Sequence, residues 1–357
     1  MKRRLLLSAG SAATLSVLTG CGGGGSASAG TSGAAAAADL STREDSTGPA
    51  TTDNPAAATD SPATQSQSPA NESPASESAA SEQPADSSGT SALPAKVLAC
   101  YYTSWDTGTH KITAVPSEFN VIYLFHAKPN GTPINGSWNN VGNGSFRFEH
   151  YDGVTAAQVQ TCRSRGQKVI LTVGGAQAGF NFNTRTKSQN FIASFRAMYD
   201  NFGGLDGCDF NNFEAGIGSS ATEMIWIAQQ LKSLYGQDFA ITAPPQPNSP
   251  EDRAMLKAMS DAGVLTWAGP QYYDWSGFNE PGFISRRTDD WVRDIGATKT
   301  VLGLAANYGN GPSLADCIRE WDAVKAKYPN IRGAFCWSAQ LNLSGGNVWG
   351  RTMKARL

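Results

Sequence analysis

The first 94 residues contain no aromatic side chain, although the whole chain has nine Trp, ten Tyr and fifteen Phe. Histidine is scarce: the three in the chain, His110, His126 and His150, lack the spacing of a metal-binding motif such as HExxH. Positive charge is not in excess either, because 28 basic and 30 acidic residues give a formal net charge of −2. We therefore expect no metal site, no cofactor and no nucleic-acid partner.

The distribution of aromatic residues divides the chain into regions. Residues 22–94 consist almost entirely of Gly, Ala, Ser, Thr, Pro and small polar residues. Such a composition cannot bury enough apolar surface to offset the entropy lost on ordering, so we predict a disordered linker. Residues 95–357 carry all the aromatic side chains and are long enough for one large α/β or β domain.

Residues 1–21 have the pattern of a bacterial lipoprotein signal peptide. The basic Lys2-Arg3-Arg4 precedes an apolar stretch, Leu5–Leu18, that is too short to span a membrane comfortably. Leu18-Thr19-Gly20-Cys21 resembles the lipobox, in which the Cys is lipidated and becomes the mature N-terminus. We expect an exported protein that is lipid-anchored at the cell envelope, on the outer membrane or cell surface, with release from the cell as the alternative. Both general secretory and twin-arginine export remain open.

From residue 97 onward, strand-like runs alternate with helical patterns. Several runs are continuously apolar, as expected for parallel strands buried on both faces. The strand-like runs are Val97–Tyr102, Asn120–Ala127, Lys168–Gly174, Leu205–Asn211, Phe239–Ala243, Leu265–Tyr273, Thr300–Ala305 and Arg332–Ser338. The helical patterns are Thr155–Arg165, Ser188–Phe202, Ala221–Tyr235, Pro250–Ala262, Asp289–Ile295 and Leu314–Tyr328. This alternation predicts an α/β fold, a (β/α)₈ TIM barrel, whose first connection, residues 103–119, is mostly loop.

Aromatic and acidic residues gather where the predicted strands end, which is where active sites of such barrels lie. Tyr101–Trp105 follows the first strand, Asp209 to Glu214 the fourth, Gln271–Asp274 the sixth and Trp337 the eighth. Sugar rings stack on aromatic faces while their hydroxyls bind polar groups. The pattern therefore favours a carbohydrate site over a purely structural aromatic core.

Four of these segments, in barrel order, resemble glycoside hydrolase family 18, the chitinase and endo-β-N-acetylglucosaminidase family. Lys168–Gly175 is similar to the third-strand SxGG motif, with Thr in place of Ser, and Leu205–Glu214 resembles the fourth-strand DGxDxDxE motif. Gln271-Tyr272-Tyr273-Asp274 is similar to the sixth-strand segment that ends in a substrate-contacting Tyr. Trp337 stands where the family presents a Trp to the sugar at the cleavage point.

The fourth-strand motif departs from the family pattern in two ways. Counting from its first Asp, the catalytic Glu should fall at Phe213, and Glu214 comes one residue later. Asn211 or Asn212 stands in place of the middle Asp. A β-bulge would return Asp209 and Glu214 to one side, whereas a regular strand would leave Asn212 and Glu214 as a pair on one face. Both geometries remain open, and each gives an amide beside a carboxylic acid.

The resemblance implies a retaining, substrate-assisted hydrolysis of β-1,4-linked N-acetylglucosamine polymers such as chitin. Glu214 would protonate the leaving oxygen while the substrate's own acetamido oxygen attacks the anomeric carbon. A neighbouring Asn would orient the acetamide N–H, Tyr273 would hold its carbonyl, and Trp337 would lie beneath the sugar. The residues assigned to catalysis are Glu214, Asn212, Asp209 and Tyr273, and those assigned to substrate binding are Trp337, Gln271, Tyr101 and Asn211.

Two other functions fit the same residues. Because the fourth-strand motif is altered, a non-catalytic chitinase-like carbohydrate-binding lipoprotein is one alternative. An endo-β-N-acetylglucosaminidase acting on protein glycans or peptidoglycan is the other. The odd number of cysteines after residue 94 leaves at least one unpaired, with Cys100 and Cys336 the candidates for a disulfide because the first and last strands of a barrel are neighbours.

Overall fold

Eight parallel strands form the wall of a barrel in the computed structural model, which describes residues 92–211 and 218–357. The strands are β1 (Val97–Thr103), β2 (Val121–Pro129), β4 (Lys168–Gly174), β5 (Gly207–Asn211), β6 (Ala240–Ala243), β7 (Trp267–Ala268), β8 (Val301–Ala305) and β9 (Gly333–Trp337). They pair in the order β7-β6-β5-β4-β2-β1-β9-β8, and β3 (Phe146–Arg147) adds to β2 in the antiparallel sense. The predicted TIM barrel is confirmed.

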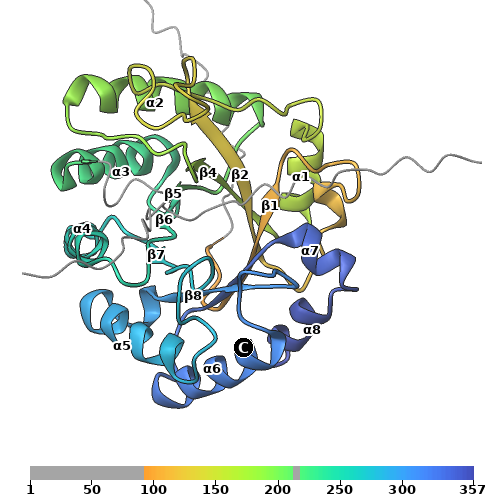
Figure 1. Cartoon of the computed structure of the whole chain (residues 1–357). Coiled ribbons are helices and arrows are strands. Elements are labelled where there is room, and N and C mark those ends of the chain that lie inside the picture. Colours follow the sequence, from red (N-terminus) through yellow and green to blue (C-terminus); the bar gives the residue numbers. More distant parts are fainter. Residues whose placement is uncertain (1–91, 212–217) are drawn as a thin grey trace, which may run out of the picture. The chain divides into compact units, whose positions relative to one another are not determined.

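Helices surround the strands in a ring (Figure 1). They are α1 (Ala156–Ser164), α2 (Arg185–Asn201), α3 (Ala221–Tyr235), α4 (Pro250–Asp261), α5 (Phe283–Ile295), α6 (Leu314–Lys327), α7 (Ala339–Ser344) and α8 (Val348–Lys354). Four of them begin after a Thr or Ser whose hydroxyl accepts a backbone N–H of the first turn: Thr155, Thr184, Ser249 and Ser313. The Thr184 cap explains why α2 begins before the predicted Ser188.

The continuously apolar strands are explained by two separate cores. In β1, Val97, Ala99 and Tyr101 belong to the cluster inside the barrel. Leu98 and Cys100, which alternate with them, belong to the cluster between the barrel and its helices. Each strand is therefore buried on both faces, as parallel strands covered by helices require.

The barrel is closed between β7 and β8 by two isolated parallel bridges, Ala268 to Thr300 and Gln271 to Gly303. Phe335 of β9 fills the space beside this junction. A Cβ atom at Gly269 or Gly303 would lie 2.5 Å from the Phe335 ring, so neither position accommodates a side chain. We refer to this junction as the β7–β8 seam.

Several predicted boundaries differ from the structure. The sixth strand, predicted over nine residues, contains only Trp267–Ala268, because the chain then turns along the β6–α4 connection, where the Gln271 N–H donates to Pro245 O. Helix α5 begins at Phe283 rather than Asp289, and α7 and α8 were not predicted. The first connection contains only a 3₁₀ turn, Ile112–Ala114, in agreement with the expected loop.

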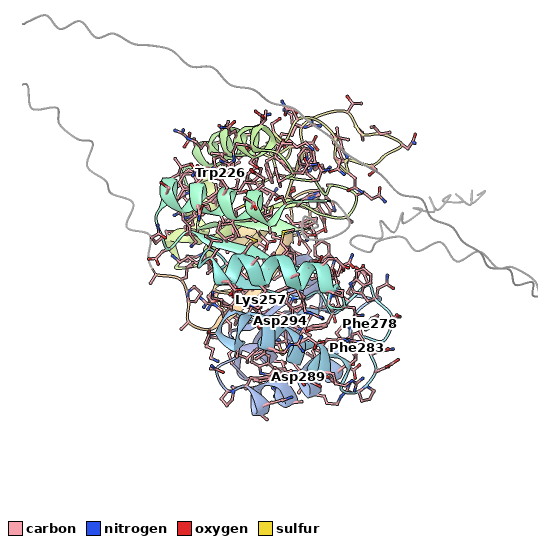
Figure 2. All side chains as sticks on the ribbon, turned by 90° about the vertical axis from the view of Figure 1, so that its left-hand side faces the viewer. Trp226, Lys257, Phe278, Phe283, Asp289 and Asp294 are labelled. Atoms are coloured by element: carbon pink, nitrogen blue, oxygen red, sulfur yellow. The ribbon has the colours of Figure 1, made fainter. Side chains whose placement is uncertain are left out.

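Polar contacts join neighbouring helices on the outside of the barrel (Figure 2). The Arg185 guanidinium of α2 lies 4.2 Å from the ring centroid of Trp226 on α3. Asp294 of α5 pairs with Arg253 of α4 at 3.1 Å, and Asp289 pairs with Lys327 of α6 at 2.7 Å. Because partly exposed pairs contribute about 0–1 kcal/mol each, they fix helix positions more than they stabilise the fold.

All five cysteines of the described residues are buried free thiols. Cys100 of β1 and Cys336 of β9 are partners in the parallel register, as expected for neighbouring strands, but they are not bonded to each other. Burial raises the pKa of both thiols well above its usual value. None of the described helices combines the length and the hydropathy needed to cross a bilayer.

Candidate active site

A buried carboxylate, Asp209, lies at the centre of the strand ends. Three hydroxyl groups donate hydrogen bonds to it: Tyr101 Oη at 2.8 Å and Thr172 Oγ1 at 3.0 Å to Oδ2, and Thr242 Oγ1 at 2.6 Å to Oδ1. Register explains the arrangement, because Asp209 of β5 is the direct partner of Thr172 on β4 and of Thr242 on β6. Four strands thus hold one carboxylate in a fixed orientation.

Burial raises the pKa of Asp209 to about 6, while the hydrogen bonds from Thr242, Tyr101 and Thr172 act in the opposite direction by favouring the charged form. The carboxyl group is therefore able to change its protonation state near neutral pH. Perturbed acids of this kind are concentrated at functional sites.

Asn211 follows Asp209 on the same face of β5, because side chains two apart on a strand point in the same direction. It is also buried, and its Oδ1 atom has no hydrogen-bond partner among the described residues. A buried amide oxygen without a partner is costly, so this atom is a candidate for contact with a ligand. The assigned residues Glu214 and Asn212, and with them the choice between bulge and regular strand, lie outside the described residues.

Aromatic rings of three strands lie next to this polar pair. Trp337 at the end of β9 is near-parallel to Tyr273, with ring centroids 6.4 Å apart and an interplanar angle of 28°. The Trp337 ring is also 5.7 Å from Tyr101 and 5.1 Å from Phe125. The structure therefore brings the rings of Trp337, Tyr273 and Tyr101 together, and their assigned roles toward a substrate stay predictions. Because Tyr101 donates its hydroxyl to Asp209, its direct contact with a sugar stays a prediction.

Gln271, the remaining assigned residue, supports a neighbouring loop. Its Nε2 atom donates to Pro244 O at 2.6 Å and its side chain is buried. Two residues that were not assigned follow in the same region. Asp274 has a positive φ of 60° and accepts a hydrogen bond from Tyr308 Oη at 2.7 Å, and burial raises its pKa to about 6.

The paired glycines of the SxGG-like segment have a steric cause. Gly175 has a φ of 128°, and a Cβ atom there would lie 2.7 Å from Phe125 Cζ and 2.8 Å from His126 Nδ1. His126 Nδ1 in turn hydrogen-bonds to Gly174 O. Glycine at 175 therefore lets the end of β4 pass close to the end of β2, and Gly174 has a φ of 88°, which favours glycine.

Nothing in the described ranges, 92–211 and 218–357, groups three or more His, Cys, Asp or Glu side chains in a way that could hold a metal ion.

The barrel carries a buried acid and stacked aromatic rings at its strand ends, and together with the family match that follows they place the chain among the glycosidases. The sequence pattern described as "Glycosyl hydrolases family 18" matches residues 97–309, more than half of the chain. The chain belongs to glycosyl hydrolase family 18. The resemblance predicted from the four motifs is thereby confirmed, although this family match does not test the altered fourth-strand residues.

Individual relatives agree with this assignment. "Endochitinase 3" of Metarhizium robertsii is 28% identical over 253 residues, which cover 61% of this chain and 77% of the relative. "Chitinase 2" of Rhizopus oligosporus is 23% identical over 210 residues, which cover 53% of this chain and only 37% of that longer protein. A family 18 chitinase from Chromobacterium violaceum has the same fold, with a TM-score of 0.61 at 17% identity over 73% of this chain and 83% of that one.

Proposed function

We propose that this chain hydrolyses β-1,4-linked N-acetylglucosamine polymers of the chitin type, with retention of configuration and with the substrate's acetamido group as the nucleophile. The observation that carries the proposal is the pair Asp209 and Asn211, which face the same side of β5. The stacked Tyr273 and Trp337 rings supply an apolar surface for a sugar ring beside this pair. The similarity to proteins named as chitinases supports the same substrate class.

In this mechanism each residue has a separate task. Glu214 donates a proton to the leaving glycosidic oxygen. Asn211 or Asn212 accepts a hydrogen bond from the acetamide N–H and turns the acetamido oxygen toward the anomeric carbon, while Tyr273 holds that oxygen. Asp209 provides negative charge near the oxazolinium ion that forms, and its three hydroxyl donors keep the carboxylate in place before the charge develops.

The sugar chain extends beyond Trp337 along the mouth of the barrel. Trp105, in the loop after β1, is 48% exposed, and its ring is 5.7 Å from the rings of both Phe125 and His126. Since Phe125 also contacts Trp337, the aromatic surface runs from the site outward to Trp105. We place a further sugar unit of the polymer on the exposed side of Trp105.

A second candidate function is carbohydrate binding without cleavage. It is favoured by the position of Phe213 where the family pattern requires the acid and by the uncharged Asn211. The direct test is hydrolysis of a fluorogenic chitobioside by the purified protein, accompanied by a chitin-binding assay. Cleavage supports the enzyme, whereas retention on chitin with no fluorescence released supports the binding protein. Release of intact N-glycans or of peptidoglycan fragments, with the chitobioside untouched, would instead indicate the endo-β-N-acetylglucosaminidase.

The proposed location is the cell envelope, with a lipid on Cys21 as the anchor. We expect Cys21→Ala to move the protein from the membrane fraction to the soluble fraction, because no acyl chain can then be attached. Cell fractionation followed by mass spectrometry of the N-terminal peptide measures both effects. A wild-type protein without acyl mass, together with a variant that remains in the membrane fraction, would contradict the anchor.

Residues 22–94 are proposed to be a linker that contributes little to folding, except for its last residues, which contact the barrel. Leu93 packs against the cluster inside the barrel, and Pro94 O accepts a hydrogen bond from Arg332 at 2.9 Å. A fragment that begins at residue 92 should therefore keep the melting temperature of the mature protein, and one that begins at residue 95 should melt a few degrees lower. A large decrease for the longer fragment, measured by calorimetry, would show that the linker packs on the barrel.

A further inference from the structure

Trp105 lies in a loop, yet the residues around it are held in place from a distant part of the chain. Gln340, in the first turn of α7, is 4% exposed and forms three hydrogen bonds with the end of β1 and this loop. Its Nε2 atom donates to Thr103 O at 2.8 Å and to Asp106 O at 3.4 Å, and its Oε1 atom accepts the Thr103 N–H at 3.2 Å. One side-chain amide thus fixes both ends of the four-residue segment that contains Trp105.

The same segment is tied to β2. The Ser104 N–H donates to Phe125 O at 2.8 Å, and the Phe125 ring meets the rings of both Trp105 and Trp337. Gln340 itself follows Trp337 by three residues. The chain at the end of β9 therefore carries the Trp337 ring directly and, three residues later, holds the Trp105 segment through Gln340.

We infer that Gln340 is a positioning residue, which keeps Trp105 at a fixed distance and angle from Trp337 so that both rings receive successive parts of one sugar chain. This inference rests on the proposed function. A loop that is already ordered loses less conformational freedom when a ligand binds, so a fixed Trp105 raises affinity without adding a contact. The benefit is restricted to sugar chains long enough to reach Trp105.

The experiment measures binding of chitobiose and chitohexaose by calorimetry to the full-length protein and its variants, all carrying Glu214→Gln so that the proposed hydrolysis does not consume the sugar. Gln340→Met keeps the volume of the side chain and removes all three hydrogen bonds. We expect it to weaken hexaose binding about fivefold and to leave chitobiose unchanged, while Trp105→Ala weakens hexaose binding about tenfold. In the double variant the Gln340 change should add nothing, because its effect passes through Trp105.

Two matched controls separate positioning from general destabilisation. Gln167 is also buried, and its Nε2 atom donates to Pro116 O at 3.1 Å and Phe119 O at 3.0 Å, but it precedes β4 at the opposite end of the barrel. Gln167→Met should lower the melting temperature without a length-dependent loss of binding. Trp226→Ala, on α3 (Figure 2), controls for the removal of a partly buried indole outside the candidate site.

Four outcomes would count against the inference about Gln340 or against the proposed function. Additive losses in the double variant, or equal losses for chitobiose and chitohexaose, would overturn the inference about Gln340. A wild-type protein that binds neither sugar would overturn the proposed function instead. The positioning role is then still measured by fluorine NMR of 5-fluorotryptophan-labelled protein: Gln340→Met should shift and sharpen the Trp105 resonance toward that of a mobile side chain, and an unchanged resonance would contradict it.

Discussion

Replacement of Glu214 by Gln should reduce the turnover number by about 10²–10⁴-fold while sugar binding is almost unchanged. The amide has the shape of the carboxylic acid but no proton to transfer to the leaving oxygen. Turnover on a fluorogenic chitobioside and the dissociation constant of chitohexaose, measured on one protein preparation, separate the two effects. The melting temperature serves as the control for folding.

The neighbouring asparagines distinguish the two possible strand geometries. If Asn212→Ala is more damaging than Asn211→Ala, the acetamide is oriented by the Asn-x-Glu pair of a regular strand. If Asn211→Ala is more damaging, Asn211 acts from the face that it shares with Asp209, and the chain bulges before Glu214. Full activity of Glu214→Gln together with loss of activity in Asp209→Asn would show that the acid has been assigned to the wrong residue.

Replacement of Asp209 by Asn should have a similarly large effect on turnover, because it removes the negative charge of the carboxylate to which Tyr101, Thr172 and Thr242 donate. It should also change the dependence of stability on pH. The pKa of Asp209 is raised from 3.8 to about 6 by burial, so the folded protein holds this proton more tightly than the unfolded chain.

The sign of the pH effect follows from this difference. The wild-type protein loses stability as the pH rises from about 4 to about 6, because the carboxyl group must ionise inside the barrel. The difference between 3.8 and about 6 corresponds to roughly 3 kcal/mol in the free energy of unfolding. The difference in unfolding free energy between Asp209→Asn and wild type should therefore shift in favour of the variant by this order of magnitude as the pH is raised from 4 to 7.

Asp252 in α4 is a matched control for this prediction. It is buried, its pKa is also raised to about 6, and its Oδ2 atom accepts the Gln246 N–H at 2.8 Å. Asp252→Asn should share the pH-dependent gain in stability and keep activity. Denaturation curves at several pH values test both variants, and parallel curves for Asp209→Asn and wild type would show that Asp209 does not titrate in this range.

The fold was predictable because parallel strands that are buried on both faces appear in the sequence as continuously apolar runs. Lys168–Gly174 was predicted with both boundaries correct. The sixth strand was predicted too long because apolar residues continue after β7 ends. Tyr272, for example, is buried in the cluster between barrel and helices although it belongs to no strand. The short helices α7 and α8 have too few turns for a helical period to show.

The candidate site was predictable where a family motif or an aromatic side chain marks it, as at Asp209, Tyr273 and Trp337. Thr242 could not be found, because a threonine in a strand is ordinary and only the register with β5 places its hydroxyl on Asp209. The role of Gln340 could not be predicted from the sequence either, because its partner Thr103 lies 237 residues away. Such contacts depend on closure of the barrel.

The β7–β8 seam gives the barrel one compliant side. The ladder between β2 and β4 runs from Val121 to Ala127, whereas here two isolated bridges and the Phe335 ring hold the wall together. Backbone amides of this seam should exchange with deuterium sooner than those between β2 and β4, since local opening needs fewer broken bonds. Tyr273 and Asp274 follow the seam directly, so local opening there would move these two residues of the candidate site while the rest of the barrel stays folded.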